Sequence, residues 1–272
     1  MDDHKNYATF AAGFALPLYF AIAFGFAWGF WGLAIAAQRA ALPPIAVGAP
    51  QVLGAFAPLF ATLILTALQG TTREFFARAL RPKVGWHRVV FALFAPAILM
   101  LGAVAIHVAL GAPAPQFPLL WQWPWVAVNF VAVLLIGGPL GEEFGWRGFA
   151  LPALQERFGA LSSGLLLGAI WALWHLPLFW MQGTAQAPIP FALFFAMTLA
   201  LGVIYTWLFN STGGSVLLCI LFHASINTWS GPLRVLPSAT GNLRPYQISI
   251  LLVWAAALFL VFTGRLQPED RR

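Results

Sequence analysis

The 272-residue sequence is 61% hydrophobic and only 8% charged, whereas a soluble domain carries roughly 25% charged residues. This composition excludes a soluble globular protein and predicts a chain whose surface faces lipid. The net charge of +6 comes from arginines spread over the loops and not from a clustered basic face, so no nucleic-acid partner is expected. Basic loops of this kind are expected to lie against the anionic headgroups of a lipid bilayer.

Eight apolar stretches approach or reach the length of about 20 residues that a membrane-spanning helix needs. Their hydrophobic runs are continuous and do not alternate, which favours helices over the strands of a barrel. The sequence therefore predicts an all-α fold, a polytopic membrane helix bundle with about eight transmembrane helices that forms a single transmembrane domain over residues 1–272. Residues 142–160 are mixed in character. The stretches are 10–37, 51–69, 89–110, 122–141, 161–181, 190–209, 214–230 and 246–263.

The basic residues predict how the chain is oriented, because cytoplasmic segments of membrane proteins are enriched in Lys and Arg. With both termini inside, the outside loops hold only Arg39, Arg234 and Arg244. We therefore expect a multi-pass protein of the cell membrane with both termini in the cytoplasm. The inside segments hold Lys5, Arg73, Arg78, Arg81, Lys83, Arg88, Arg147, Arg157, Arg265, Arg271 and Arg272.

Two adjacent carboxylates follow the fourth apolar stretch, in the sequence GEEFGWR at 141–147. Polar groups buried in a membrane are costly, so they mark candidate functional sites. On a helix, Glu143 and Arg147 lie on one face and can form an ion pair. Glu142 is rotated by about 100° from Glu143 and lacks such a partner, which favours it as the carboxylate that exchanges a proton. The alternative is an interfacial charge cluster that only ends a helix.

His175 is the next polar residue inside a predicted span. Trp171 precedes it by one helical turn, so the indole can pack on the imidazole and fix its orientation. Pro177 follows and is expected to kink the helix just past the histidine. Taken alone, His175 is better explained as a buried histidine whose hydrogen bond is made to a neighbouring carbonyl.

His223 and Asn227 are four residues apart in the seventh stretch, so both side chains project from the same helical face. Hydrogen-bond donors directed at one point can stabilise a developing oxyanion. The alternative is a polar clamp between helices, which is common in membrane bundles. A single shared site explains all three polar groups together, whereas the alternatives need a separate reason for each.

These residues resemble the motifs of the CAAX protease and bacteriocin-processing (Abi) family of intramembrane glutamic endopeptidases. Glu142, Glu143 and Arg147 match its EExxxR motif. His175 matches an FxxxH motif in which Trp171 replaces the phenylalanine, and His223 with Asn227 match a histidine followed four residues later by asparagine. The resemblance covers about residues 120–230, which it identifies as the catalytic core.

The resemblance implies hydrolysis of a peptide bond by an activated water molecule. In this sequence Glu142 would be the general base, and His175 would hold and polarise the water. His223 and Asn227 would stabilise the oxyanion. Glu143, Arg147 and Trp171 would support this geometry. The expected substrate is a membrane-associated peptide or protein, and an excess of Arg over Lys typical of GC-rich bacteria favours processing of a small membrane peptide such as a bacteriocin over a farnesylated protein.

Other functions are compatible with the same residues. Two histidines and a glutamate could form a catalytic zinc site, but the usual HExxH helix is absent, so no cofactor and no metal are expected. A proton-coupled carrier would also use membrane carboxylates and histidines. A carrier is expected to show broken helices in both halves of the chain, whereas this sequence shows such an interruption at 137–139 without a symmetric partner. A non-catalytic scaffold or immunity protein on the same fold is the third possibility.

A shared site has a consequence for how deep the chain lies. His223 and His175 are about 12 and 22 Å from the cytoplasmic ends of their spans at 1.5 Å per residue. For Glu142 to reach them, the buried chain has to continue past residue 141 to about 155. The run at 137–139 (GGP) is then expected to kink or break the helix before the glutamates, and Pro152 could break it again. The site should be a water-filled cavity open to the cytoplasm.

Overall fold

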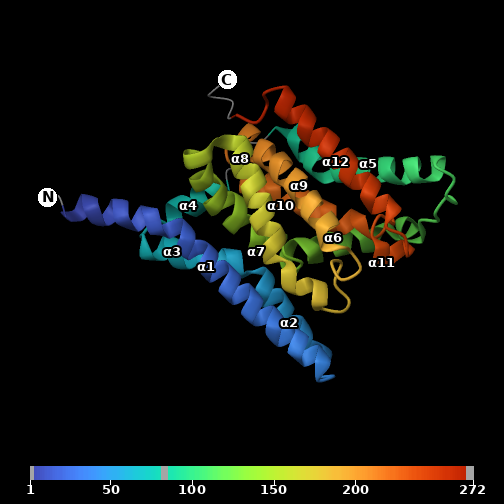
Figure 1. Ribbon diagram of the computed structural model, residues 1–272, viewed down its shortest axis with the longest axis horizontal. Coiled ribbons are helices and arrows are strands. Elements are labelled where there is room, and N and C mark those ends of the chain that lie inside the picture. Colours follow the sequence, from blue (N-terminus) through green and yellow to red (C-terminus); the bar gives the residue numbers. More distant parts are fainter. Residues whose placement is uncertain (1–2, 81–84, 268–272) are drawn as a thin grey trace.

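The computed structural model describes residues 3–80 and 85–267, and every regular element in this part of the chain is a helix. Helix α1 lies along one edge, α8, α9 and α10 occupy the middle, and α5 and α12 lie on the other side (Figure 1). The predicted all-α bundle is confirmed. The α-helices are α1 (Asp3–Arg39), α2 (Pro44–Ala55), α3 (Ala57–Leu68), α4 (Thr72–Ala79), α5 (Trp86–Ala109), α6 (Trp123–Ile136), α7 (Pro139–Glu143), α8 (Leu151–Trp174), α9 (Phe191–Ser211), α10 (Val216–Ser230), α11 (Pro237–Thr240) and α12 (Arg244–Phe262). Two 3-10 helices, η1 (Pro118–Gln122) and η3 (Leu176–Trp180), and one π-helix, η2 (Phe144–Ala150), complete them.

The described residues contain five helical stretches that are long and apolar enough to cross a membrane, or six if α2 and α3 together form one bent span. One of the five covers Trp123–Trp180, which includes α6, α7, η2, α8 and η3. Helix α10 is apolar but shorter. The chain is therefore a multi-pass membrane protein. Its predicted number of about eight spans remains a prediction.

The second predicted span, 51–69, differs from the structure. Its helical part begins earlier, at Pro44, and it is divided at Phe56 into α2 and α3, which are bent by 48° relative to each other. Pro58 explains the break, because a proline has no N–H to donate and its ring excludes the carbonyl four residues before it. Gly141 packs into the bend so closely that a Cβ atom there would lie 2.8 Å from the Ala55 carbonyl oxygen.

The chain remains helical after residue 141, as the depth argument requires. Gly138 breaks it just before the glutamates, with a φ of 109° that only glycine adopts readily. The π-helix η2 then leads into α8. Pro152 does not break the helix, contrary to expectation, because it lies at the start of α8, where a missing N–H is tolerated. The kink within α8 lies instead at Gly159, whose φ is 71°.

Helices α8 and α9 pack backbone to backbone through glycines. Gly164 and Gly168 are one turn apart on α8, which is the small-residue spacing typical of close helix pairs in membranes. A Cβ atom on Gly202 of α9 would collide with the Gly164 carbonyl oxygen, and one on Gly168 would lie 2.6 Å from the Thr198 carbonyl oxygen. This contact fixes the end of α8, where Trp171 and His175 lie, against α9.

Replacing Gly202 by valine is expected to force α8 and α9 apart. Overpacking a close contact costs about 1–3 kcal/mol, so the purified protein in detergent should melt several degrees lower than wild type. Gly29→Ala is the control, because a Cβ atom at that position on α1 meets nothing within 4 Å. Equal melting temperatures for the two variants would contradict the close packing of α8 on α9.

Candidate active site

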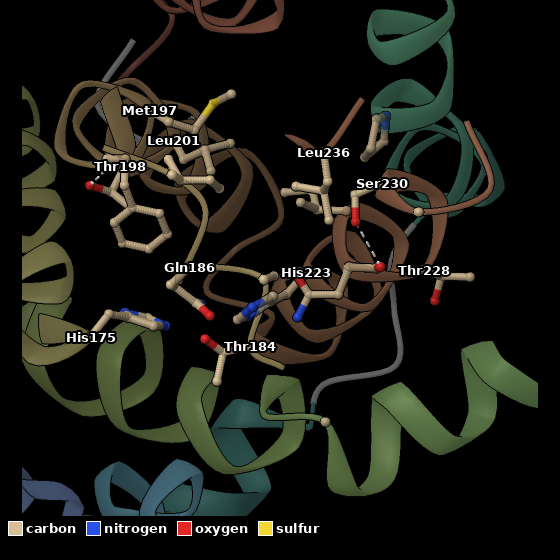
Figure 2. Close-up of a pocket in the computed structure, with 18 of the residues that line it drawn as sticks. His175, Thr184, Gln186, Met197, Thr198, Leu201, His223, Thr228, Ser230 and Leu236 are labelled. Carbon is tan, nitrogen blue, oxygen red and sulfur yellow. Dashed lines mark hydrogen bonds between the residues drawn. The ribbon is translucent and has the colours of Figure 1, made fainter. Parts of the chain in front are cut away.

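The polar residues singled out in the sequence converge on one cavity of about 510 Å³ in the middle of the bundle. Glu142 enters it from α7, Trp171 and His175 from the end of α8, and His223 and Asn227 from α10. Figure 2 shows His175 and His223 facing this cavity from two different helices. The structure therefore places Glu142 beside the histidines in the interior, and not at a surface far from both.

Glu142 is buried and is held from two directions. Its backbone N–H donates to the Gly138 carbonyl oxygen at 2.8 Å, and its Oε2 accepts a hydrogen bond of 2.6 Å from the Trp171 indole N–H. A Cβ atom on Gly138 would lie 2.6 Å from Glu142 Oε1. Gly138 therefore both turns the chain and leaves room for the carboxylate. As expected, Glu142 has no cationic partner among the described residues.

Glu143 does not line the cavity but forms a buried charged cluster next to it. Its Oε1 accepts from Arg147 Nη1 at 2.9 Å, which confirms the predicted pair, and it also lies 2.8 Å from His223 Nδ1. The side chains of Arg147 and Glu143 are 1% and 0% exposed. The guanidinium carbon of Arg147 lies 3.7 Å from the ring centroid of Tyr205 and 4.7 Å from that of Trp171. Such stacking suits the planar guanidinium better than a lysine ammonium.

His175 lies at the end of α8, where the helix gives way to the 3-10 helix η3 that contains Pro177, so the helix is interrupted just past the histidine, as the sequence predicts. Its Nδ1 is 2.8 Å from the Trp171 carbonyl oxygen. Its ring packs edge-on against Trp171, with centroids 5.4 Å apart, as the spacing of the two residues predicts. The Trp171 carbonyl contacts only Nδ1 of His175, so Nε2 of the same ring remains available for a role in the cavity.

The partners of both histidines define where their protons are. A carbonyl oxygen faces Nδ1 of His175 and a carboxylate oxygen faces Nδ1 of His223, and both oxygens are acceptors only. We therefore assign the Nδ1 proton to each ring. In the neutral ring Nε2 then carries a lone pair, and it becomes a donor only when the ring takes up a second proton. Each histidine is held by one nitrogen and keeps the other for chemistry.

Asn227 follows His223 by one turn on α10 and lines the same cavity. Its backbone carbonyl accepts a hydrogen bond from Ser230 at 3.0 Å, whereas its side-chain amide has no partner in the described part of the chain. Both donors of that amide are therefore available to a group in the cavity. The position of Asn227 agrees with the predicted common face of α10.

The donor set also bears on a metal. Within residues 3–80 and 85–267, no group of three or more His, Cys, Asp and Glu side chains lies close enough together to hold a metal ion. Glu142 is engaged by Trp171, and His223 is engaged by Glu143. The expectation that the site holds no metal remains a prediction.

Some lining residues carried no signal in the sequence. Gln186 and Thr184 lie in the loop between η3 and α9, where polar residues are ordinary, yet both face the cavity (Figure 2). Tyr205 reads as one more aromatic residue of an apolar span, although its ring covers Arg147. The pattern GGP at 137–139 did point to a break before the glutamates, but not to the space that Gly138 leaves for Glu142.

Comparison with known proteins finds two similarities to this chain. A family model described as Type II CAAX prenyl endopeptidase Rce1-like matches residues 121–229, a range that contains all the residues assigned to the site above. CAAX prenyl protease 2 of Methanococcus maripaludis is 32% identical over 180 residues, which are 63% of this chain and 64% of that protein. The match thus spans slightly less than two thirds of the relative's length.

Proposed function

We propose, on the premise that this chain belongs to the Rce1-like family of type II CAAX prenyl endopeptidases, that it hydrolyses a peptide bond of a membrane-associated substrate. The observation that carries this proposal is the convergence of Glu142, His175, His223 and Asn227 on one interior cavity. A carboxylate base and an oxyanion hole suffice for hydrolysis without a covalent intermediate.

The reaction begins with a water molecule between Glu142 and His175. Glu142 takes one proton from the water, His175 Nε2 accepts a hydrogen bond that orients it, and the water oxygen attacks the carbonyl carbon of the scissile bond. The carbonyl oxygen becomes an oxyanion. The C–N bond then breaks, and Glu142 returns its proton to the leaving amine. These steps consume one water and leave a carboxylic acid and an amine as the products.

The oxyanion is stabilised by Asn227 Nδ2–H and by His223. His223 donates from Nε2 when its ring carries both protons, with Nδ1 held by the Glu143 carboxylate. Arg147 holds the same carboxylate oxygen and keeps Glu143 oriented. Glu143 and Arg147 therefore act through His223 and are positioning residues.

The substrate is a membrane-associated peptide or protein. Apart from its catalytic corner, the cavity is mainly apolar, and Met197 and Leu201 of α9 form part of that wall (Figure 2). An apolar wall suits a lipid-modified or strongly hydrophobic peptide, such as the prenylated substrates that the relatives' names describe. Small membrane peptides of the bacteriocin type are the second substrate class. The site opens to the cytoplasm, with both chain termini on that side.

Cleavage by the purified protein in liposomes tests this proposal. Fluorogenic peptides of one sequence, with and without a prenylated cysteine, and a bacteriocin-like membrane peptide would be incubated with and without a chelator. Cleavage that survives the chelator is the expected result. Loss of cleavage with the chelator would assign His175 and His223 to a zinc site and overturn the metal-free mechanism. No cleavage of any peptide would contradict the endopeptidase and favour a carrier, tested by proton-coupled uptake, or a scaffold.

A further inference from the structure

The loop between η3 and α9 forms one wall of the cavity and presents a single amide side chain to it. Gln186 lines the cavity together with Gly183 and Thr184. In Figure 2 its side chain reaches into the space between His175 and His223, next to Thr184. This side chain makes no hydrogen bond to any described residue, although it is partly buried. This amide therefore has two donors and two acceptor lone pairs that are available to a bound molecule beside the catalytic groups.

The backbone around Gln186 is fixed, so the side chain is presented in a defined place. Thr184 Oγ1 donates towards the Leu178 and Met181 carbonyl oxygens at 2.7 and 2.9 Å and accepts from the Ala187 N–H at 3.2 Å. The Gln186 carbonyl accepts from the Ile189 N–H at 2.9 Å. The loop is also tied to the end of α1, where Gln38 bonds both the carbonyl and the N–H of Gln182.

A peptide substrate brings main-chain donors and acceptors into the cavity, and these have to be satisfied there. Many proteases and peptide-binding domains provide a strand edge for this purpose, but the described part of this chain has no strand. Glu142 and the Nδ1 atoms of both histidines already have partners. A primary amide can accept from the N–H or donate to the C=O of a substrate peptide group, whose two polar groups point in opposite directions in the trans form.

We propose that Gln186 binds a main-chain peptide group of the substrate beside the scissile bond and thereby sets which bond lies against Glu142. This inference rests on the proposed endopeptidase activity and adds a substrate-binding residue to it. Because the contact is made with the bound substrate as well as with the transition state, its loss weakens binding more than it slows the chemical step.

Gln186→Leu tests the assignment, with Gln182→Leu as the matched control. Gln182 lies on the same loop, but its side chain faces a separate surface depression and not the cavity. In liposomes, Gln186→Leu should raise KM about tenfold, the usual effect of losing one hydrogen bond, while kcat stays within about twofold. Gln182→Leu should match the wild type, and all three proteins should have the same melting temperature.

Substrate analogues give a second, independent readout. In a set of peptides, one backbone N–H at a time outside the scissile bond is N-methylated. At the position bound by Gln186 the wild type should lose about tenfold in kcat/KM, whereas Gln186→Leu should lose nothing further. Losses that add at every position, or a fall in kcat with KM unchanged, would overturn the assignment. If the wild type cleaves the unmodified peptide while these results contradict the role of Gln186, only the Gln186 assignment is wrong and the proposed endopeptidase activity stands.

Discussion

Glu142→Gln is expected to abolish cleavage while leaving the fold intact. Glutamine preserves the shape of the side chain and can still accept the indole N–H of Trp171 through its carbonyl oxygen, but it cannot take a proton from water. General-base catalysis contributes about 10²–10⁴-fold, so kcat should fall by roughly 10³-fold. Because Glu142 has no ion-pair partner among the described residues, its neutral replacement leaves no buried charge there uncompensated. Initial rates on the fluorogenic peptides and the melting temperature would be measured together.

The control for this change is Glu156→Gln, which makes the same substitution at an exposed position of α8. It should retain the activity and the melting temperature of the wild type. A Glu142→Gln protein that still cleaves at more than a tenth of the wild-type rate would remove Glu142 from the role of base. His223 would then be the candidate general base, because Nε2 of its neutral ring carries a lone pair.

Arg147→Met is expected to have the largest effect on stability. Removing one partner of a buried ion pair costs about 3–5 kcal/mol, and Glu143, which is 0% exposed, would keep, among the described residues, only the His223 ring as a partner. The loss of stacking on Tyr205 and Trp171 adds to this. Thermal unfolding in detergent, followed by tryptophan fluorescence, should show a large decrease in melting temperature, accompanied by loss of cleavage.

Two further proteins show whether charge is the cause. Arg157→Met alters an exposed arginine of α8, and such surface changes usually stay within about 0.5 kcal/mol. The double variant Glu143→Met with Arg147→Met removes both charges and should be more stable than Arg147→Met alone. If Arg147→Met melted like Arg157→Met, the pair would contribute nothing to the fold. If the double variant were the least stable, packing and not charge would dominate.

The short-range features of the site follow from sequence spacing, because a helix fixes which neighbours meet. The pairing of Glu143 with Arg147 and the packing of Trp171 on His175 both follow from residues four positions apart. The same helical geometry places the Glu142 side chain in a different direction from that of Glu143. The continuation of the helix beyond residue 141 followed from a different argument, namely that polar groups sharing one site have to reach the same depth.

Contacts between distant segments could not be derived in this way. The hydrogen bond between His223 and Glu143 joins residues 80 positions apart, and no periodicity indicates which carboxylate the histidine meets. From the sequence, His223 is expected to stabilise the oxyanion, but its contact with Glu143 is not predicted. Similarly, the break at Phe56 depends on one proline within an otherwise suitable apolar run. Gln186 is found only once the loop is seen to face the cavity.

The π-helix η2 sets the direction in which the glutamates face relative to α8. The N–H of Leu151 donates to the Trp146 carbonyl, five residues earlier, so this turn holds more residues than an α-helical turn. If residues 144–150 formed an ordinary α-helix of the same number of residues, the extra residue would rotate the glutamates by about 100° relative to α8. Apolar length and span boundaries would hardly change, but Glu142 would no longer face Trp171. The wider turn thus holds the carboxylate in the cavity without any change in the apolar length of the span.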